Sequence, residues 1–474
     1  MNKFLQKLNF MKSVQIFLLI TSISLSSCFM IENSGRADSF VYKNKRNFDV
    51  KKFIDTLQHR TFLYFINETD FETGLVKDRS TANSPASIAA MGFALPVWAI
   101  GAENLWISRN EAAQRTLNML KFLLYSKQSP EPDATGYKGL YYHFLDMKTG
   151  KRTWNSELST IDTAWLLGGI IFASNYFNRQ NPVEEKIRRF SDSLIARVDW
   201  DWLTSKYENE FLGTITLGWK PESGFDKIGW VGYNEGLFLY ILAAGLGYNN
   251  YKTAYKKWLS TYRWKEPFKG LSHVIFPPLF GHQYPHMYID FRNLRDEFMR
   301  KKNIDYFENS RRAVLTQWKY AILNPQDWKG YDSLTWGLTA CDGPGPAFND
   351  NGKKFNWYIA RGTSGPEIVM NDDGTIAPTA AAASIVFAPE LVAKTVFNMF
   401  VKYGKKGLWG KYGFVDAFNP TLNWYDKDYL AIDQGPIVIM IQNYKNGFVW
   451  KYTMKDSIII NGLKKLGFVK ISGN

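Results

Sequence analysis

The chain has very little cysteine. Only Cys28 and Cys341 occur among 474 residues, and Cys28 ends a segment with the composition of a targeting signal. With only Cys341 left in the mature chain, an intrachain disulfide is excluded, so stability must come from the core. A lone cysteine is far more often a small buried residue than a nucleophile, and we expect Cys341 to be structural.

Several other signatures are missing. No linker rich in Pro, Gly or Ser follows residue 48, so we expect a single domain over residues 49–470. The formal net charge is +14, yet no compact Lys/Arg array interleaved with aromatics and no nucleic-acid motif occurs. We therefore expect no nucleic-acid partner, and a basic surface spread over the molecule.

The first 28 residues look like a processed signal. Positive charges at Lys3, Lys7 and Lys12 precede a short apolar run over residues 14–23, and Leu-Ser-Ser-Cys ends at Cys28. This order resembles a bacterial lipoprotein signal; an ordinary secretory signal is the alternative. We expect residues 1–28 to be the signal peptide, Cys28 to carry lipid and residues 29–48 to be a flexible tether. The protein would then be anchored to a membrane, in the periplasm or at the outer membrane.

Apolar residues at helical spacing dominate the rest of the chain. Phe53, Leu57 and Phe65 predict a helix over residues 50–65, and Ser108 with Glu111 forms a capping box before the third apolar run. Further helices are expected to begin near residues 88, 159, 182, 234, 251, 305, 378, 389, 436 and 455, with one more around residues 286–299. Paired helices joined alternately by short and long connections suggest an all-α fold of helical hairpins arranged in a ring.

Some long segments between these helices have a different pattern. Residues 139–153 alternate around a turn at 146–150 as a β-hairpin would, residues 211–219 look strand-like, and Asp373-Gly374 marks a turn within residues 355–376. Long loops inside a compact domain are usually functional, so we expect these segments near a ligand.

Glu235 is the most suggestive acidic residue. It lies in Gly-Trp-Val-Gly-Tyr-Asn-Glu-Gly (residues 229–236), immediately before an apolar helix. Three other segments place acids beside Gly, Trp or Tyr: residues 155–165 with Glu157 and Asp162, residues 336–345 with Asp342, and residues 429–436 with Asp433. Cleavage of a glycosidic bond needs two carboxyl groups, one protonated and one ionised, so the pattern suggests a glycosidase.

The roles of these acids differ in what they require. Asp162 and Asp433 are expected at helix N-termini, which stabilise the ionised form and suit a base, although capping of the first turn is an equal alternative. A general acid needs protection from water. We therefore expect Glu235 to be the general acid if Trp230 and Tyr233 shield it, with Asp162 or Asp433 as the base.

Other residues are candidates for binding sugar. Aromatic residues make up 16% of the chain, and their flat faces suit pyranose rings. His282 and His286 are four residues apart, but Pro285 argues against one helix presenting both to a metal, so we expect hydrogen bonds to sugar and neither metal nor cofactor. Arg361 could bind a carboxylate or a hydroxyl, or form a surface ion pair. Packing in the core is the alternative for each aromatic residue. The predicted substrate-binding set is Glu157, Trp165, Trp230, Tyr233, His282, Tyr284, Trp336, Asp342 and Arg361.

Five motifs together resemble the glucoamylase-like proteins related to glycoside hydrolase family 144. They are Ser-Thr-Ile-Asp-Thr-Ala (159–164), Gly-Tyr-Asn-Glu-Gly (232–236), Phe-Gly-His-Gln-Tyr (280–284), Trp-Gly-Leu-Thr-Ala (336–340) and Asp-Gln-Gly-Pro (433–436). The resemblance covers residues 50–468 and implies an (α/α)₆ toroid of six helical hairpins, with long loops and short β-hairpins at the cleft mouth. It also implies endo-β-1,2-glucanase activity, with Asp162 and Glu235 at positions implicated in catalysis.

Three other functions stay open. An exo-acting, glucoamylase-like hydrolase of α-glucan or oligosaccharide would use the same acids. A non-catalytic, glycan-binding surface lipoprotein would need the aromatic residues but no pair of facing carboxyl groups. A lyase acting on acidic polysaccharide would suit the positive net charge. The expected partners are a glucan or oligosaccharide and the membrane that holds the lipid anchor, and the expected state is a monomer.

Overall fold

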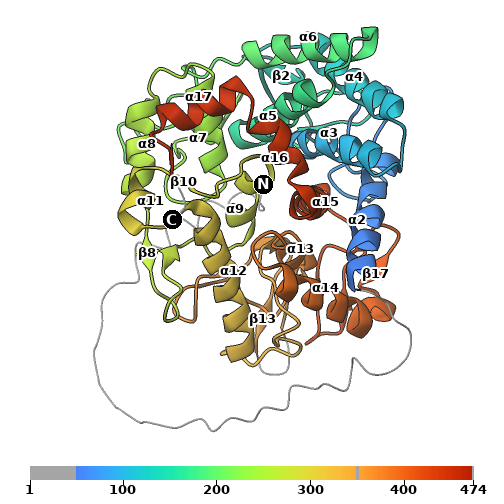
Figure 1. Cartoon of the computed structure of the whole chain (residues 1–474), viewed down its shortest axis with the longest axis vertical. Helices are drawn as coiled ribbons and strands as arrows, with labels where there is room; N and C mark the ends of the chain where they lie inside the picture. Colours follow the sequence, from blue (N-terminus) through green and yellow to red (C-terminus); the bar gives the residue numbers. More distant parts are fainter. Residues whose placement is uncertain (1–49, 349–351, 472–474) are drawn as a thin grey trace. The chain divides into compact units, whose positions relative to one another are not determined.

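Helices make up most of the regular structure (Figure 1). The computed structural model describes residues 50–348 and 352–471, and these lie within one compact unit. The helices are α2 (Val50–Asn67), α3 (Ile88–Glu103), α4 (Arg109–Tyr125), α5 (Thr160–Tyr176), α6 (Pro182–Ala196), α7 (Gly236–Gly245), α8 (Tyr251–Ser260), α9 (Phe280–Gln283), α10 (Pro285–Tyr288), α11 (Glu297–Lys302), α12 (Tyr306–Leu323), α13 (Pro378–Ala382), α14 (Pro389–Tyr403), α15 (Ala431–Asn446), α16 (Phe448–Thr453) and α17 (Ser457–Lys465), with a 3₁₀ turn η1 (Gly404–Lys406).

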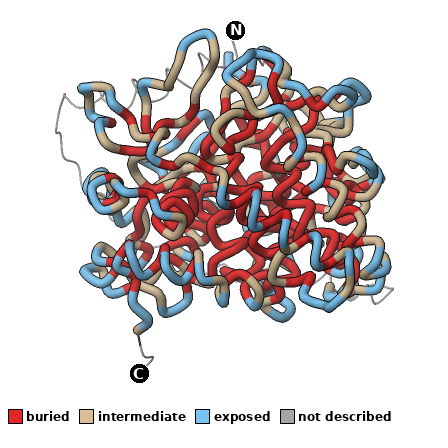
Figure 2. The backbone as a smooth tube through the Cα atoms, turned by 90° about the horizontal axis from the view of Figure 1, so that it is seen from above, coloured by how far each residue is buried: buried red, intermediate tan, exposed pale blue. Residues whose placement is uncertain are grey.

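The helices are of two kinds, and the two kinds alternate along the chain. In α3 every residue from Ile88 to Ala102 is buried, and α5, α7 and α15 are buried almost as completely. In α4, α6, α8, α12 and α14 only one face is buried. A helix that is apolar all round must lie inside a protein, whereas an amphipathic helix covers it. The backbone drawn in Figure 2 is correspondingly red in the interior and pale blue at its margins.

The buried helices pack closely, including some from distant parts of the chain. Helices α3 and α5 meet at Gly92 and Gly169, where a Cβ atom on Gly169 would lie 2.1 Å from the Gly92 carbonyl oxygen. No larger residue fits between these backbones. Helix α15 packs against both α2 and α3, and α17 (red in Figure 1) packs against α7 (green). The C-terminal third of the chain therefore completes the core that the N-terminal helices begin.

Strands are short, and each pairing between the named strands of the described residues is antiparallel. They lie in the connections between helices, where they hold loops together rather than form a layer. The pairs are β1 (Ala86–Ser87) with β4 (Phe144–Leu145), β2 (Gly136–Tyr137) with β3 (Leu140–Tyr141), β8 (Trp264–Lys265) with β9 (His273–Val274), β10 (Leu294–Arg295) with β21 (Val469–Lys470), β11 (Ala340–Cys341) with β14 (Ile359–Ala360), β12 (Ala347–Phe348) with β13 (Lys354–Phe355), β15 (Gly362–Thr363) with β16 (Val369–Met370), β17 (Trp409–Gly410) with β18 (Gly413–Phe414), and β19 (Phe418–Asn419) with β20 (Trp424–Tyr425); β6 (Gly218–Lys220) lies between β5 (Leu158–Ser159) and β7 (Gly224–Phe225).

The expectation of a helix-rich fold is confirmed, and one expected helix is wrong. Residues 286–299 do not form a continuous helix: α10 ends at Tyr288, and α11 begins only at Glu297. Between them Asn293 takes a left-handed conformation (φ 61°), and Leu294–Arg295 pairs with the C-terminal strand. That distant pairing overrides the local helical spacing. Cys341 is buried, as its isolation suggested.

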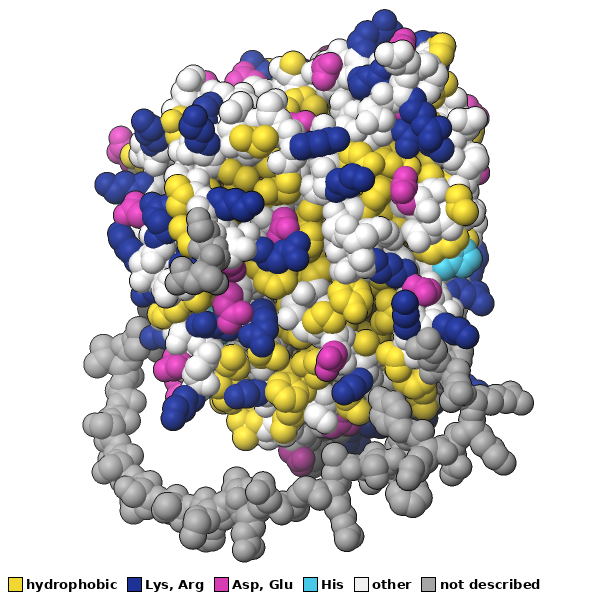
Figure 3. Space-filling model, viewed as in Figure 1, with side chains coloured by type: hydrophobic (Ala, Val, Ile, Leu, Met, Phe, Trp, Pro, Cys, Tyr) yellow, Lys and Arg dark blue, Asp and Glu magenta, His cyan; other side chains and the backbone are white. Residues whose placement is uncertain are grey.

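The expected signal peptide (1–28), the lipidated Cys28 and the tether (29–48) lie outside the described residues, and they stay predictions. Each helix among residues 50–348 and 352–471 is too short or too polar to span a bilayer. On the face drawn in Figure 3, Lys and Arg are interspersed with acidic and apolar side chains instead of gathering in one patch. This face therefore shows the scattered basic charge that the composition suggested.

Candidate active site

The N-terminal ends of four buried helices lie at one side of the core. The loop before α3 is hydrogen-bonded to the loop before α15, because the Ala431 N–H donates to the Asp78 carbonyl oxygen at 2.8 Å. Strand β1, which leads into α3, pairs with β4, and the adjoining His143 N–H donates to the Glu157 carbonyl oxygen just before α5. The Trp230 indole, just before α7, donates to Thr160 Oγ1 at the start of α5. The acids predicted at helix starts are thereby brought to the same side.

His143 joins two of the predicted acids. Its Nδ1 lies 3.0 Å from Glu157 Oε1, and its Nε2 lies 3.5 Å from Asp162 Oδ2. Asp162 is buried in the first turn of α5, but the helix is capped by Ser159, whose Oγ accepts from the Asp162 N–H at 3.2 Å. Because Ser159 already serves as the cap, the Asp162 carboxylate is free to face His143. Capping of α5 therefore does not explain why residue 162 is an aspartate.

Arg79 lies in the loop before α3, and carboxylate groups of three aspartates surround its guanidinium. Its Nη1 lies 2.8 Å from Asp342 Oδ2 and 3.5 Å from Asp428 Oδ2, and its Nε lies 3.5 Å from Asp78 Oδ2. One guanidinium therefore balances the charge of several acids. The predicted residue Asp342 belongs to this group, where it is fixed by an arginine that the sequence did not single out.

Asp416 and Asp433 form a buried pair of carboxyl groups. Asp416 Oδ2 accepts from the Asp342 N–H at 2.7 Å, and the two aspartate side chains are hydrogen-bonded to each other. Among the described residues, Asp416 Oδ1 and Asp433 Oδ2 find no other donor. Burial raises the pKa of Asp433 to about 7. Burial and the charges of Asp433 and Asp342 raise the pKa of Asp416 well above its usual range. We infer that Asp416 keeps its proton and donates it to Asp433.

This shared proton makes stability depend on pH. An acid whose pKa is raised by folding stabilises the protein below its unfolded value, here 3.8, and that stability is lost as the pH rises through the folded value. Asp416→Asn keeps a donor toward Asp433 and has no proton to lose. In urea unfolding, we expect the free energy of unfolding of the wild type to fall, relative to that of the variant, by at least about 1 kcal/mol between pH 5 and pH 8. Asp192→Asn on the exposed face of α6 is the control, and an equal difference at both pH values would contradict a shared proton.

Glu235 lies at the start of α7, partly exposed, and makes no capping hydrogen bond. The buried Tyr284 links it to the Asp416–Asp433 pair: burial, Asp433, Tyr358 and Glu235, in that order of size, raise the pKa of Tyr284. Trp230 packs against Gly236, the residue after Glu235. Tyr233 turns into the core instead, where its hydroxyl lies 3.4 Å from Ser310 Oγ. Of the two aromatic residues expected to shield Glu235, only Trp230 is placed beside it by these contacts.

Two groups of described side chains have ligand atoms within 4.8 Å of one another and could be considered for a metal ion: His143 with Glu157 and Asp162, and Asp342 with Asp416 and Asp426. The second offers only carboxylates, a set that would suit Ca²⁺ rather than Zn²⁺. Asp342 is already paired with Arg79, and Asp416 with Asp433. Since an arginine and a proton already balance charge there, the expectation of no metal is kept as a prediction.

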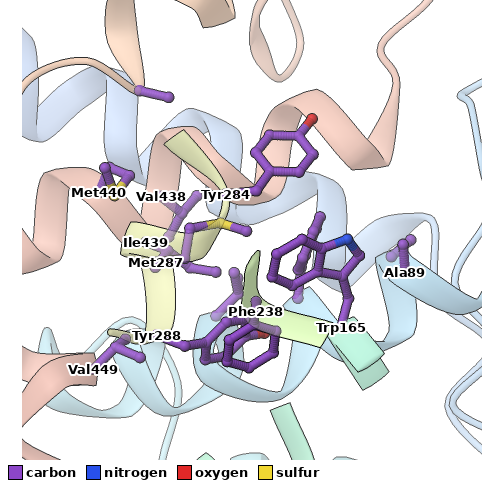
Figure 4. Packing of buried hydrophobic residues seen from close by; sticks show 14 of the residues in the cluster. Ala89, Trp165, Phe238, Tyr284, Met287, Tyr288, Val438, Ile439, Met440 and Val449 are labelled. Atoms are coloured by element: carbon purple, nitrogen blue, oxygen red, sulfur yellow. The ribbon is translucent and has the colours of Figure 1, made fainter. Parts of the chain in front are cut away.

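Four residues predicted to bind sugar are core residues. Trp165 and Trp336 are almost completely buried. The Trp165 ring stacks on Phe238 at 4.9 Å (Figure 4), and the Trp336 indole donates to Thr395 Oγ1. His282 is fully buried, with Nε2 3.1 Å from the Phe276 carbonyl oxygen. Tyr233 is buried as described above. A pyranose cannot reach these side chains, so the structure corrects the stacking and hydrogen-bonding roles assigned to them.

Arg361 also differs from its expected role. It is fully buried, and its Nε and Nη2 bind the two carboxylate oxygens of Asp373 at 2.8 and 2.9 Å. Its Nη1 donates to the Cys341 carbonyl oxygen at 2.8 Å. The guanidinium does orient a carboxylate, as one reading of the sequence proposed, but that carboxylate is in the core and not in a substrate. Arg361 instead supports the loop that carries Asp342.

Sequence reasoning missed several ionisable residues of the site. His143, Asp416 and Asp426 lie in or beside apolar strand-like segments, and an ionisable residue inside such a segment is a usable signal of function. Burial and the charges of Asp416 and Asp342 raise the pKa of Asp426 to about 8. Asp226, near Glu157, has its pKa raised to about 6 by burial and by that glutamate. The missed residues are Asp78, Arg79, His143, Asp226, Tyr358, Asp416 and Asp426.

Known proteins resemble this chain over most of its length. Residues 227–457 match the family described as "Putative glucoamylase". The crystal structure of a putative glucoamylase from Bacteroides uniformis is 31% identical, with a TM-score of 0.77, over 90% of this chain and 99% of that one. An endo-β-1,2-glucanase from Chitinophaga pinensis is 28% identical, with a TM-score of 0.76, over 89% and 98%. An exo β-1,2-glucooligosaccharide sophorohydrolase from Parabacteroides distasonis is 27% identical over 89% of this chain, which spans 58% of that protein's length.

A helical protein that gathers buried and partly buried carboxyl groups at the starts of its buried helices has the groups that a glycoside hydrolase needs. The chain belongs to the glucoamylase-like family. Glu235, Asp342 and Asp433 lie within the segment that the family model matches, whereas Glu157 and Asp162 precede it.

Proposed function

We propose that the protein hydrolyses β-1,2-glucan by endo cleavage and releases sophoro-oligosaccharides. The observation that carries this proposal is the gathering of Glu235, Asp162 and the Asp416–Asp433 pair at one side of the core, around Tyr284 and His143. The Chitinophaga pinensis endo-β-1,2-glucanase, of which the chain covers 98%, supports the linkage and the endo mode. The exo-acting relative is covered over only 58% of its length, and exo cleavage is the alternative.

In this proposal Glu235 is the general acid that protonates the leaving oxygen. Asp433 is one candidate for the base: its carboxylate is ionised while Asp416 holds the shared proton. Asp162 is the other candidate, oriented by His143, which Glu157 holds from the opposite nitrogen. Asp342 and Trp230 remain candidates for contacting the sugar, whereas the buried Tyr284, whose hydroxyl donates to the Ile432 carbonyl oxygen at 2.9 Å, would only shape the site. The three proposed catalytic groups, Glu235, Asp162 and Asp433, lie at or directly before the first turn of a helix, which favours precise positioning.

We also propose that the helices form six hairpins around the site. Helices with one buried face alternate with wholly buried ones along most of the chain, and consecutive helices of the two kinds pack against each other: α2 with α3, α3 with α4, α5 with α6, α7 with α8, and α13 with α14. This alternation is what a ring of inner helices inside a ring of outer helices requires, and it supports an (α/α)₆ toroid.

The test is product analysis on β-1,2-glucan, starch and a uronate polymer. Endo cleavage of β-1,2-glucan predicts a ladder of oligosaccharides at early times, whereas exo cleavage predicts one short product from the start. Cleavage of starch alone would overturn the linkage, and cleavage of the uronate polymer would indicate a lyase. Binding of β-1,2-glucan without any product would favour a non-catalytic glycan-binding protein.

A further inference from the structure

The tip of the loop between β4 and β5 is a tight turn with an unusual residue. The Ser156 N–H donates to the Thr153 carbonyl oxygen at 3.1 Å, and both central residues, Trp154 and Asn155, have left-handed backbones (φ 55° and 49°). Two positive φ angles at the centre of a four-residue turn are the mark of type I′, which favours Asn and Gly. Asn155 suits its position, but a tryptophan at residue 154 strains the backbone.

Leaving the apolar side chain of Trp154 in water also costs free energy, because 62% of the residue is exposed. Its ring lies 5.2 Å from the ring of Phe144, and Phe144 stacks on His143 at 4.0 Å with an interplanar angle of 13°. His143 Nε2 lies 3.5 Å from Asp162 Oδ2. An open tryptophan face therefore lies two ring contacts away from a histidine that holds a proposed catalytic carboxylate.

The turn is held in place by charged side chains. Lys220 Nζ donates to the Asn155 carbonyl oxygen at 2.8 Å, and Arg152 Nε donates to the Ser156 carbonyl oxygen at 2.5 Å. Arg152 is itself fixed by Glu222, at 2.6 and 3.0 Å. A pre-ordered aromatic side chain loses little conformational freedom when a ligand packs on it.

Leu105 shows that an exposed residue with positive φ is not by itself a sign of function. It is 89% exposed with φ 59°, but it directly follows the C-cap of α3, where a left-handed residue is an ordinary way for a helix to end. The conformation of Leu105 is explained by its helix. Trp154 does not lie at a helix end, so helix termination does not explain its conformation. Its ring also contacts Phe144, which stacks on His143 of the site.

We propose that Trp154 is a binding platform for a glucosyl unit of the substrate away from the bond that is cleaved. The inference rests on the proposed function. The C–H face of a pyranose packs well on an indole ring, whereas the ring offers little to a charged or purely polar ligand. Only a chain long enough to pass from Asp162 beyond His143 and Phe144 reaches this platform. Trp154 therefore confers a preference for long glucan over short oligosaccharides.

Trp154→Asn removes the ring but keeps the turn, because Asn is a favoured residue at this position of the turn. We expect KM for long β-1,2-glucan to rise about tenfold, the equivalent of one lost stacking contact, with kcat within about twofold. We expect a much smaller change in KM for sophorotriose, and an intermediate KM for Trp154→Phe on long glucan. Because backbone strain is relieved, Tm should not fall in the Asn variant.

Leu105→Asn is the matched control: it makes the same backbone change at the far end of α3, and we expect it to leave KM for every substrate as in the wild type. If the wild type cleaves long glucan and Trp154→Asn has the same KM, the platform is overturned and the proposed function stands. A Tm lowered by several degrees, with equal losses on all substrates, would show a merely structural role and overturn it too. A wild type that neither cleaves nor binds β-1,2-glucan would refute both proposals.

Discussion

Glu235→Gln is expected to lower kcat on β-1,2-glucan by about 10²–10⁴-fold, the usual contribution of general acid catalysis, while the glucan still binds. The amide has nearly the same shape as the acid, but it cannot donate a proton to the leaving oxygen. Glu235 makes no capping hydrogen bond at α7, so the helix does not depend on its charge. Product release from glucan measured with purified variants checks the rate, and calorimetric titration with the same glucan checks binding.

Glu210→Gln makes the same chemical change at an exposed position, and we expect wild-type kinetics from it. A leaving group that needs no proton offers a further check. An activated aryl glycoside should be cleaved by Glu235→Gln with a smaller loss than glucan suffers, because its leaving group departs as a stable anion. Wild-type cleavage of glucan by folded Glu235→Gln would remove Glu235 from the mechanism and leave Asp162 and the Asp416–Asp433 pair to be reconsidered.

Arg361→Met is expected to reduce the free energy of unfolding by about 3–5 kcal/mol, the cost of leaving a buried charge without its partner. Burial by itself would raise the pKa of Asp373, but the hydrogen bonds and charge of Arg361 lower it below its usual value. Removing the guanidinium therefore leaves a buried acid that must either stay charged at a high cost or take up a proton. Urea unfolding at pH 7 measures the loss.

The matched control is Lys301→Met, which removes a surface ion pair with Glu297 in which both side chains are about two-thirds exposed; it should cost less than about 1 kcal/mol. The double variant Arg361→Met/Asp373→Leu should recover part of the stability, since no unpaired charge remains in the core. A loss from Arg361→Met no larger than that from Lys301→Met would show that the buried pair is not needed for the stability of this loop.

Local sequence was a good guide to where helices begin. Ser108, Ser159 and Asn181 each accept a hydrogen bond from the backbone N–H three residues later. Capping depends on a few neighbouring residues and can be recognised without knowing the fold. The false helix at residues 286–299 shows the limit of this approach, because Leu294–Arg295 pairs with residues 469–470, far away in the sequence.

Aromatic residues were the weakest part of the site prediction. Trp165 and Trp336 stand beside acids in the sequence, but each points into the core from its own segment. Trp154, which is exposed and contacts His143 only through Phe144, was not predicted, because nothing in its neighbours shows that residues 154 and 155 form a turn. Whether a ring meets a sugar or the core depends on which side of the backbone faces solvent.

The sequence by itself determined that the chain is helix-rich and which acids begin helices, because both follow from spacing and composition within a few residues. Only the tertiary structure decided the chemical setting of those acids. It brought Asp416 to Asp433, His143 to Asp162 and Arg79 to Asp342, pairs that lie between 17 and 263 residues apart. A carboxyl group is made an acid or a base by burial, charge and hydrogen bonds, and in this protein the groups that supply them come from other parts of the chain.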